Sequence, residues 1–346
     1  MPLSLTTLTE PSNSTTTTLP AGFDASIAYF LGQCCSLTYA QFGASWGASL
    51  DTSSLTALNV AGNTATIKVV ATLTSSQSVG TGIAAGDAGG YVTLPAGFVI
   101  AVSCSSPPTG VPASFTVVAL RGTRTFAEWI EDAEALPAKF CQSNTSLFGS
   151  GWGSVHSGFL AAYAVGTEGA VGSEPPANPG AGSIAAQVRS AITGLASTQP
   201  IYVTGHSLGG GLASLCAMDL AANLSFTAVS MYSLASPRVA VGASPVPTYD
   251  DQVEFVQNYQ QYVPNSFRIV HAADIVPILP PSSLTLGPLT LTAMHVTDAW
   301  STSKQSGGLT SNVISFCAQT GDIGGNHACD AVYLPYLQAL ATGFGS

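Results

Sequence analysis

Residues 201–223 read IYVTGHSLGGGLASLCAMDLAAN, an apolar run followed by the pattern G-x-S-x-G and a helix-forming segment. A strand that turns sharply into a helix around a serine exposes the serine hydroxyl, and the flanking glycines avoid collisions with neighbouring backbone. A Gly/Ser-rich composition favours chance copies of this pattern, but here the strand before it and the helix after it match the context that the motif requires. The stretch predicts that Ser207 is a nucleophile, with the positive end of helix 208–223 directed at its hydroxyl.

Strands and helices alternate on both sides of this stretch. The expected strands are 115–120, 201–204, 226–234 and 267–272. The expected helices are 125–136, 183–195 and 208–223. Buried strands separated by helices predict an α/β fold, with a mainly parallel central sheet covered by helices on both faces. Ligands of such sheets bind at the carboxyl ends of the strands.

The N-terminal third of the chain has a different texture. Residues 1–20 form a polar Thr/Ser-rich tail, and apolar residues at helical spacing predict a helix at 25–40. Residues 41–114 are rich in Gly, Ser, Thr and Val and predict an insertion of short strands and turns in a small antiparallel layer. We therefore expect a single domain over residues 21–346. Surface loops are expected at 166–182, 242–250 and 279–288.

Composition excludes several classes of function. The 346 residues include only 8 Lys+Arg against 18 Asp+Glu, giving a net charge of −10, so no basic patch for nucleic acid is expected. Apolar stretches are interrupted well before the roughly 18 residues that a membrane span needs. No signal peptide is visible. The seven cysteines include no C-x-x-C pair, which argues against a zinc site. We predict no metal and no cofactor. Cys317 and Cys329 are expected to form a disulfide.

A nucleophilic serine needs a histidine base that is oriented by a carboxylate. In this fold the chain order is serine, acid, histidine, and Asp274 follows the last expected strand as the acid should. The downstream histidines are His271, His295 and His327. His271 precedes the acid and is excluded by the order. Spacing does not choose between His295 and His327.

Further motifs follow one another between residues 115 and 338. They are LRGT at 120–123, VHSGF at 155–159, GHSLG at 205–209, ASPRV at 235–239, RIV at 268–270 and DIVP at 274–277 with PP at 280–281. With these motifs the chain resembles the class 3 lipases, the fungal-type triacylglycerol lipases whose relatives include feruloyl esterases and phospholipases. The resemblance implies the α/β-hydrolase fold and favours an extracellular location.

The resemblance also implies roles for particular residues. It supports Asp274 as the triad acid, and it places the triad histidine in a short N-H segment before a tyrosine-containing stretch. Asn326-His327, with Tyr333 and Tyr336 beyond, matches that description and leaves His295 as the reserve base. The other candidates are interpreted as structural or surface groups: His156, His206, Asp298 and Asp322. We expect the His206 side chain to point away from the site.

An oxyanion hole needs donors aimed at the developing negative charge. The residue after the nucleophile supplies one backbone N–H, here Leu208. The second donor is expected in the loop after strand 115–120, and the resemblance assigns it to Thr123.

The segment 125–136 is amphipathic, with Phe126, Trp129 and Ile130 on its apolar side and four acids elsewhere. The ordinary interpretation is a surface helix packed on the core. The resemblance implies instead a lid that covers the nucleophile and opens at a lipid surface. An anionic outer face favours neutral glycerides over acidic phospholipids.

These observations predict a serine ester hydrolase, a lipase that cleaves acylglycerol or other carboxylic esters through an acyl-enzyme. The expected partner is an ester or lipid substrate, at a lipid–water interface. Two alternatives stay open: a closed-pocket carboxylesterase of feruloyl or acetyl esterase type, and a non-catalytic member that binds lipid.

Overall fold

The structure is a computed structural model that describes ten parts of the chain. These are residues 19–43, 49–59, 63–78, 91–122, 136–140, 151–164, 182–244, 251–297, 313–316 and 323–343. Most of the expected N-terminal tail lies outside them, and so does the expected helix 125–136 apart from its last residue.

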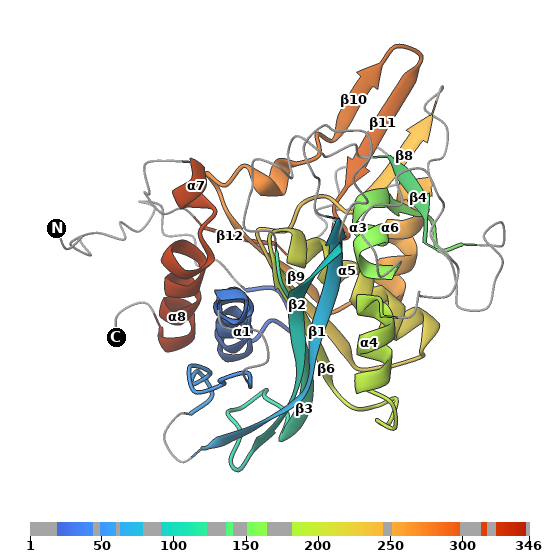
Figure 1. Cartoon of the computed structure of the whole chain (residues 1–346). Coiled ribbons are helices and arrows are strands. Elements are labelled where there is room, and N and C mark those ends of the chain that lie inside the picture. Colours follow the sequence, from blue (N-terminus) through green and yellow to red (C-terminus); the bar gives the residue numbers. More distant parts are fainter. Residues whose placement is uncertain are drawn as a thin grey trace.

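A seven-stranded sheet forms the centre of the molecule (Figure 1). Its strands, in spatial order, are β1 (Ala65–Ser78), β2 (Tyr91–Cys104), β3 (Ser114–Leu120), β6 (Ile201–His206), β7 (Val229–Leu234), β9 (Ser266–His271) and β12 (Val313–Phe316). The five strands from β3 to β12 pair in parallel, whereas β1 and β2 are antiparallel. The predicted mainly parallel sheet is confirmed.

Helices cover both faces of this sheet, as the sequence predicts. In Figure 1, α1 (Ala25–Gly43) and α8 (Leu334–Thr342) lie on one face. The opposite face carries α3 (Ser157–Ala164), α4 (Ile184–Ala191), α5 (Leu208–Met218) and α6 (Asp251–Tyr262).

Alternation along β3 shows why both faces are apolar. Val117 and Ala119 belong to the core under α1, while Val118 and Leu120 belong to the core under α5. Successive side chains of a strand point to opposite faces, so a strand buried on both sides reads as a continuous apolar run.

The insertion at 41–114 extends the central sheet. β1 and β2 are each 14 residues long, and β2 pairs with β3 from Gly97↔Leu120 to Ser103↔Ser114. The expected antiparallel pairing is confirmed, but the strands are longer than expected and belong to the central sheet. Backbone pairing with β3 satisfies the N–H and C=O groups of β2, which a small isolated layer would do less completely.

A second sheet of five strands was not predicted. Its order is β10 (Ser283–Leu286), β11 (Leu289–Met294), β8 (Ala240–Ser244), β5 (Ser154–His156) and β4 (Pro137–Lys139). The loops expected at 242–250 and 279–288 are therefore wrong where they overlap β8 and β10. Prolines suggested loops, but the Ser/Thr–Leu alternation on both sides of Gly287-Pro288 forms a hairpin.

The cysteines of the described segments are reduced. Cys34, Cys35, Cys104, Cys216 and Cys329 are buried free thiols. The bridge expected between Cys329 and Cys317 is not formed, and Cys317 itself lies outside the described residues. Burial raises the pKa of Cys35 to about 12, so that thiol is unreactive at neutral pH.

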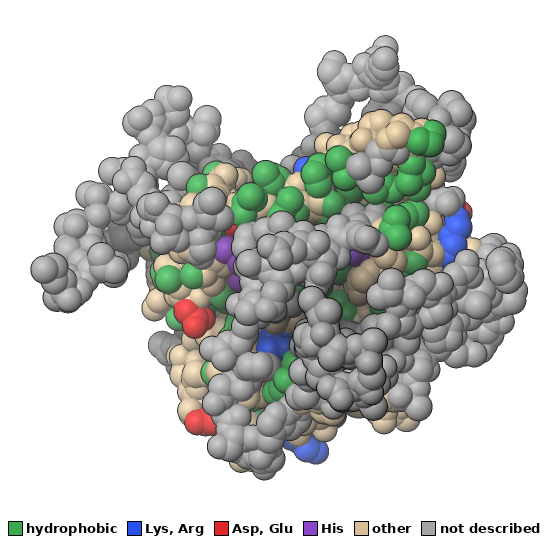
Figure 2. All heavy atoms as spheres, turned by 45° about the horizontal axis from the view of Figure 1, so that its top comes forward, with side chains coloured by type: hydrophobic (Ala, Val, Ile, Leu, Met, Phe, Trp, Pro, Cys, Tyr) green, Lys and Arg blue, Asp and Glu red, His purple; other side chains and the backbone are tan. Residues whose placement is uncertain are grey.

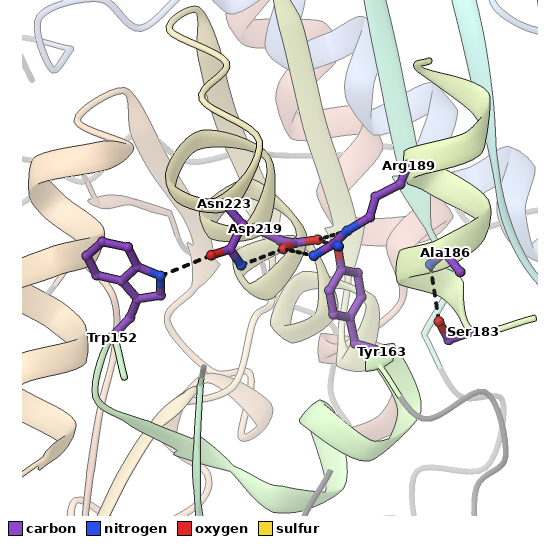
Figure 3. Close-up of polar contacts among 7 residues, drawn as sticks. All are labelled: Trp152, Tyr163, Ser183, Ala186, Arg189, Asp219 and Asn223. Atoms are coloured by element: carbon purple, nitrogen blue, oxygen red, sulfur yellow. Dashed lines mark hydrogen bonds and ion pairs between the residues drawn. The ribbon is translucent and has the colours of Figure 1, made fainter. Parts of the chain in front are cut away.

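Among the described side chains on the face shown in Figure 2, charged groups are few, in keeping with the 8% of charged residues in the chain. One buried charge nevertheless anchors α5. Asp219 begins the π-helical segment Asp219–Asn223 that continues α5, and Arg189 of α4 pairs with both of its carboxylate oxygens, at 2.6 and 3.1 Å (Figure 3). Tyr163 of α3 and Asn223 also donate to this carboxylate. Asp219 thus links α3 and α4 to the end of α5.

Removal of that carboxylate is expected to destabilise the fold. Asp219→Ala leaves the Arg189 guanidinium and the Tyr163 hydroxyl without their acceptor, and loss of one partner of a buried pair costs about 3–5 kcal/mol. Urea unfolding followed by circular dichroism measures the change, with the exposed acid variant Asp330→Ala as the control. A loss below about 1 kcal/mol for Asp219→Ala, similar to that of a surface substitution, contradicts the anchoring role.

Candidate active site

Ser207 sits on a strained turn between β6 and α5. Its φ and ψ are 61° and −131°, a conformation that residues other than glycine rarely adopt, and only 3% of the residue is exposed. The turn is held at both ends, because Ser207 N–H donates to Leu234 O at 3.0 Å and Ser207 O accepts from Gly210 N–H at 2.9 Å. The Ser207 hydroxyl does not cap α5. The backbone therefore holds the side chain at the carboxyl edge of the sheet without using its oxygen.

The segment that ends β3 packs directly against this turn. A methyl group on Gly209 would lie 2.3 Å from Leu120 O, and one on Gly122 would lie 3.0 Å from Ser207 Cβ. Only glycine permits these approaches. Residue 122 therefore abuts Ser207, and Thr123, the expected oxyanion donor, follows it outside the described residues.

Leu208 occupies the first position of α5. Backbone N–H groups in the first turn of a helix have no acceptor within the helix. They point along the helix axis toward its positive end. The position of Leu208 is thus compatible with the oxyanion role that the motif predicts.

Asp274 and His327 form a close pair. His327 Nδ1 lies 2.8 Å from Asp274 Oδ2, although 53 residues separate them. Asp274 follows β9, and His327 follows the short helix α7 (Ile323–Asn326). The Asp274 side chain is fully buried and that of His327 is 12% exposed. The structure thus brings together the acid and the histidine that the sequence favoured.

Two further donors fix the Asp274 carboxylate. Val276 N–H donates to Oδ1 at 2.9 Å, and the Tyr333 hydroxyl donates to Oδ2 at 2.7 Å. Tyr333 in turn accepts a bond from His271 N–H at 3.0 Å. Burial and the Asp274 charge raise the pKa of Tyr333, so the hydroxyl keeps its proton and remains a donor.

Tyr333 was not assigned a role from the sequence. It belongs to the π-helical segment Cys329–Tyr333, which α8 continues. The only sequence signal for it was its place in the tyrosine-containing stretch after His327.

His295, the reserve base, lies elsewhere. Its Nε2 is 2.8 Å from Pro277 O, and the residue is 5% exposed. Burial lowers the pKa of His295, and the positive charges of Arg268 and Arg238 lower it further. The imidazole is therefore a neutral structural group that holds the segment after Asp274.

The His206 side chain was expected to point away from the site, but it does not. Its ring packs on that of His327, with 4.6 Å between ring centroids, and its Nδ1 lies 2.8 Å from the Tyr39 hydroxyl of α1. Burial, and then the proximity of His327, lower the pKa of His206 and keep it neutral. Because His206 directly precedes Ser207, this contact places the His327 ring beside the turn that carries Ser207.

His156 is a structural residue, as expected. Its Nδ1 accepts a bond from Gly158 N–H at 3.1 Å, and its ring stacks on Phe159 at 4.2 Å. Burial lowers its pKa to about 4. The side chain helps begin α3, beneath which α5 packs.

Several predicted features fall on residues that are not described. Phe126, Trp129 and Ile130 of the expected lid are among them. In the described segments, no three His, Cys, Asp or Glu side chains come together as a metal site. No helix in those segments is both long and apolar enough to cross a membrane.

Comparison with known proteins supplies further evidence. Residues 117–284 match the family model described as lipase (class 3). A Caenorhabditis elegans protein, lipase ZK262.3, is 40% identical over 82 residues, which are 23% of this chain and 20% of the relative. The match therefore spans about a fifth of that curated relative.

Solved structures of fungal lipases are also among the matches. The native Rhizomucor miehei lipase–propeptide complex is 20% identical with a TM-score of 0.41, over 78% of this chain and 70% of that one. Lip2 lipase from Yarrowia lipolytica is 17% identical with a TM-score of 0.43, over 73% of each chain. The match over 117–284 includes most of β3, the Ser207 turn and Asp274. Residues 117–284 are therefore similar to the class 3 lipases, and the structure places them on a mainly parallel central sheet with helices on both faces.

Proposed function

We propose that the protein is a serine ester hydrolase, a lipase that cleaves acylglycerol and other carboxylic esters through an acyl-enzyme intermediate. The observation that carries the proposal is the strained Ser207 turn in contact, through His206, with the buried His327–Asp274 pair. The match of residues 117–284 to the class 3 lipase family model supports it.

In the proposed mechanism Ser207 Oγ attacks the ester carbonyl carbon while His327 Nε2 takes the hydroxyl proton. The bond between the carbonyl carbon and the alkoxy oxygen then breaks, and His327 returns the proton to the leaving alcohol. Water attacks the acyl-enzyme by the same steps and releases the carboxylic acid. Asp274 accepts the Nδ1–H of His327, which leaves Nε2 free of hydrogen and able to act as the base.

The tetrahedral intermediate carries a negative oxygen that needs fixed donors. We assign Leu208 N–H and Thr123 to that role, since Leu208 begins α5 and Thr123 follows the segment that abuts Ser207. One such donor typically lowers the barrier by about 3 kcal/mol. The α5 dipole adds to the same field.

We further propose that the segment 125–136 is a lid, with Phe126, Trp129 and Ile130 facing the site or the lipid. The family resemblance supports this role. The acidic residues of the segment favour uncharged acylglycerols as the substrate class.

Hydrolysis rates against acyl chain length test the proposal. Esters from acetyl to palmitoyl are offered below and above their solubility limits, and an alkyl phosphonate probe is mapped by mass spectrometry to the residue that it modifies. A preference for long chains, a rise in rate above the solubility limit, and a single adduct at Ser207 are expected. Preference for short or aromatic acyl groups without that rise indicates a closed-pocket esterase, and no hydrolysis at all leaves only a lipid-binding role.

A further inference from the structure

The β10–β11 hairpin separates its side chains by chemistry. Leu284 pairs with Leu291 across the two strands, whereas the adjacent pairs are Ser283↔Thr292 and Thr285↔Thr290. Because strand side chains alternate between faces, the leucine pair lies on one face and the hydroxyl pairs on the other. The two hydroxyls of Thr285 and Thr290 are 3.3 Å apart. The hairpin is amphipathic although it protrudes from the body of the protein in Figure 1.

One apolar side chain on the hairpin and one at its base are exposed, whereas Leu291, the partner of Leu284 on β11, is buried. Ile278, in the 3₁₀ turn η2 (Val276–Ile278), is 58% exposed, and Leu284 on the edge strand β10 is 43% exposed. Residues 275–297 contain no Lys, Arg, Asp or Glu. Charged side chains usually protect the edge strands of soluble proteins from association. An edge strand without them is therefore a candidate contact surface.

The apolar segment is held rigidly at its base. Arg238 donates from Nη1 to Ile278 O and Pro280 O and from its backbone N–H to Leu279 O. His295 binds Pro277 O, and Ala293 N–H donates to Ser282 O. Five contacts thus fix the backbone around Ile278, whose side chain is exposed although those of Val276 and Pro277 beside it are buried.

Ile278 belongs to the segment that binds the Asp274 carboxylate. Ile278 lies four residues beyond Asp274, and the Val276 N–H between them binds the Asp274 carboxylate. A lipid surface that contacts Ile278 therefore also approaches the carboxyl ends of the strands, where Ser207 lies.

We propose that Ile278 and Leu284 form a docking surface for an uncharged lipid phase, such as the surface of an acylglycerol droplet. This inference deepens the proposed function and rests on it for the nature of the partner. Segment 275–297 carries no Lys or Arg, and Arg238 at its base donates to the carbonyl groups of Ile278 and Pro280. Since the protein also carries a net charge of −10, a neutral lipid surface matches it best. The hydroxyl face of the hairpin stays toward water.

A second copy of the chain fits less well. Pro281 and Pro288 flank β10, and a proline has no N–H to donate to an added strand. Two copies with a net charge of −10 each would also repel one another.

Flotation with lipid tests the proposal. The parent protein, the double variants I278S/L284S and I278D/L284D, and the control Leu195→Asp are mixed with triolein droplets coated with phosphatidylcholine, and the bound fraction is measured after centrifugation. Leu195 is 37% exposed and precedes β6 at its amino end, so the control adds the same charge at the opposite end of the sheet. Each Asp substitution is expected to weaken partitioning roughly tenfold, each Ser substitution severalfold, and the control not at all.

Hydrolysis of a short-chain ester below its solubility limit separates this inference from the proposed function. The variants are expected to keep the parental rate on this soluble ester while their partitioning falls. Equal partitioning of the parent and both double variants overturns the docking surface, and so does a parent that dimerises in solution through Ile278 and Leu284. If the parent hydrolyses no ester but the double variants still lose partitioning, the proposed function fails and the docking surface stands.

Discussion

Ser207→Ala is expected to lower kcat for ester hydrolysis by about 10⁵- to 10⁶-fold. The substitution removes the oxygen that attacks the carbonyl, and the donors of the oxyanion hole and the bound substrate account for the small rate that remains. The turn itself should persist, because its hydrogen bonds to Leu234 O and from Gly210 N–H involve only backbone atoms. Thermal unfolding is therefore expected to change little.

The matched control for this variant is Ser225→Ala. Ser225 also has a positive φ, 60°, but it is exposed and lies in the connection that precedes β7, at the opposite end of the sheet. Stopped assays with a chromogenic ester measure both variants beside the parent. A Ser207→Ala protein that retains a tenth or more of the parental kcat would falsify the assignment of the nucleophile.

Local patterns predicted the elements around Ser207 because each of them carries its own signal. The apolar run at 201–204 and the helix from Leu208 are both almost continuously buried, and the G-x-S-x-G motif lies between them. β4 and β5 have no such signal, since each is three residues long and β5 pairs with β8 at Val155↔Ala240. Pairing between residues 85 positions apart depends on the fold already formed around it.

The residues of the site also include some that the sequence predicted and some that it did not. The order of serine, acid and histidine made Asp274 predictable, and the family resemblance selected His327 from two candidates. Tyr333 reaches the site from a π-helical segment and Tyr39 from the α-helix α1, and their contacts depend on how those segments pack on the sheet. A π-helical turn shifts the following side chains relative to a 3.6-residue period, so periodicity does not show which tyrosine faces Asp274.

The expected lid is the predicted feature that the structure tests least. Phe126, Trp129 and Ile130 were placed by helical spacing and by the resemblance, and they lie outside the described residues. Their role therefore stays a prediction, and the rise in rate above the solubility limit is the measurement that tests it.

Asp274→Asn is expected to lower kcat by about 10⁴-fold while leaving the protein folded. The reason lies in the three donors that this carboxylate accepts: Val276 N–H at Oδ1, and His327 Nδ1–H and Tyr333 O–H at Oδ2. An asparagine has a single acceptor oxygen. If that oxygen keeps Val276 N–H, the amide NH₂ faces His327 and Tyr333.

Facing an amide donor, His327 Nδ1 must become the acceptor, so the imidazole hydrogen moves to Nε2. The histidine then presents N–H instead of a lone pair to Ser207 and no longer acts as a base. In the other amide orientation the NH₂ opposes Val276 N–H, which leaves two donors face to face in a buried position and costs about 1–3 kcal/mol of stability. Both orientations disable the pair.

Asp330→Asn is the matched control for this variant. It is the same substitution at an exposed residue, three positions after His327. Rates are compared across pH 5–10. Because the tautomer and not the ionisation of His327 blocks the Asp274→Asn variant, raising the pH should not restore its rate unless hydroxide replaces the lost base at the upper end. A variant that recovers the parental rate near neutral pH would show that Asp274 does not hold the base in position.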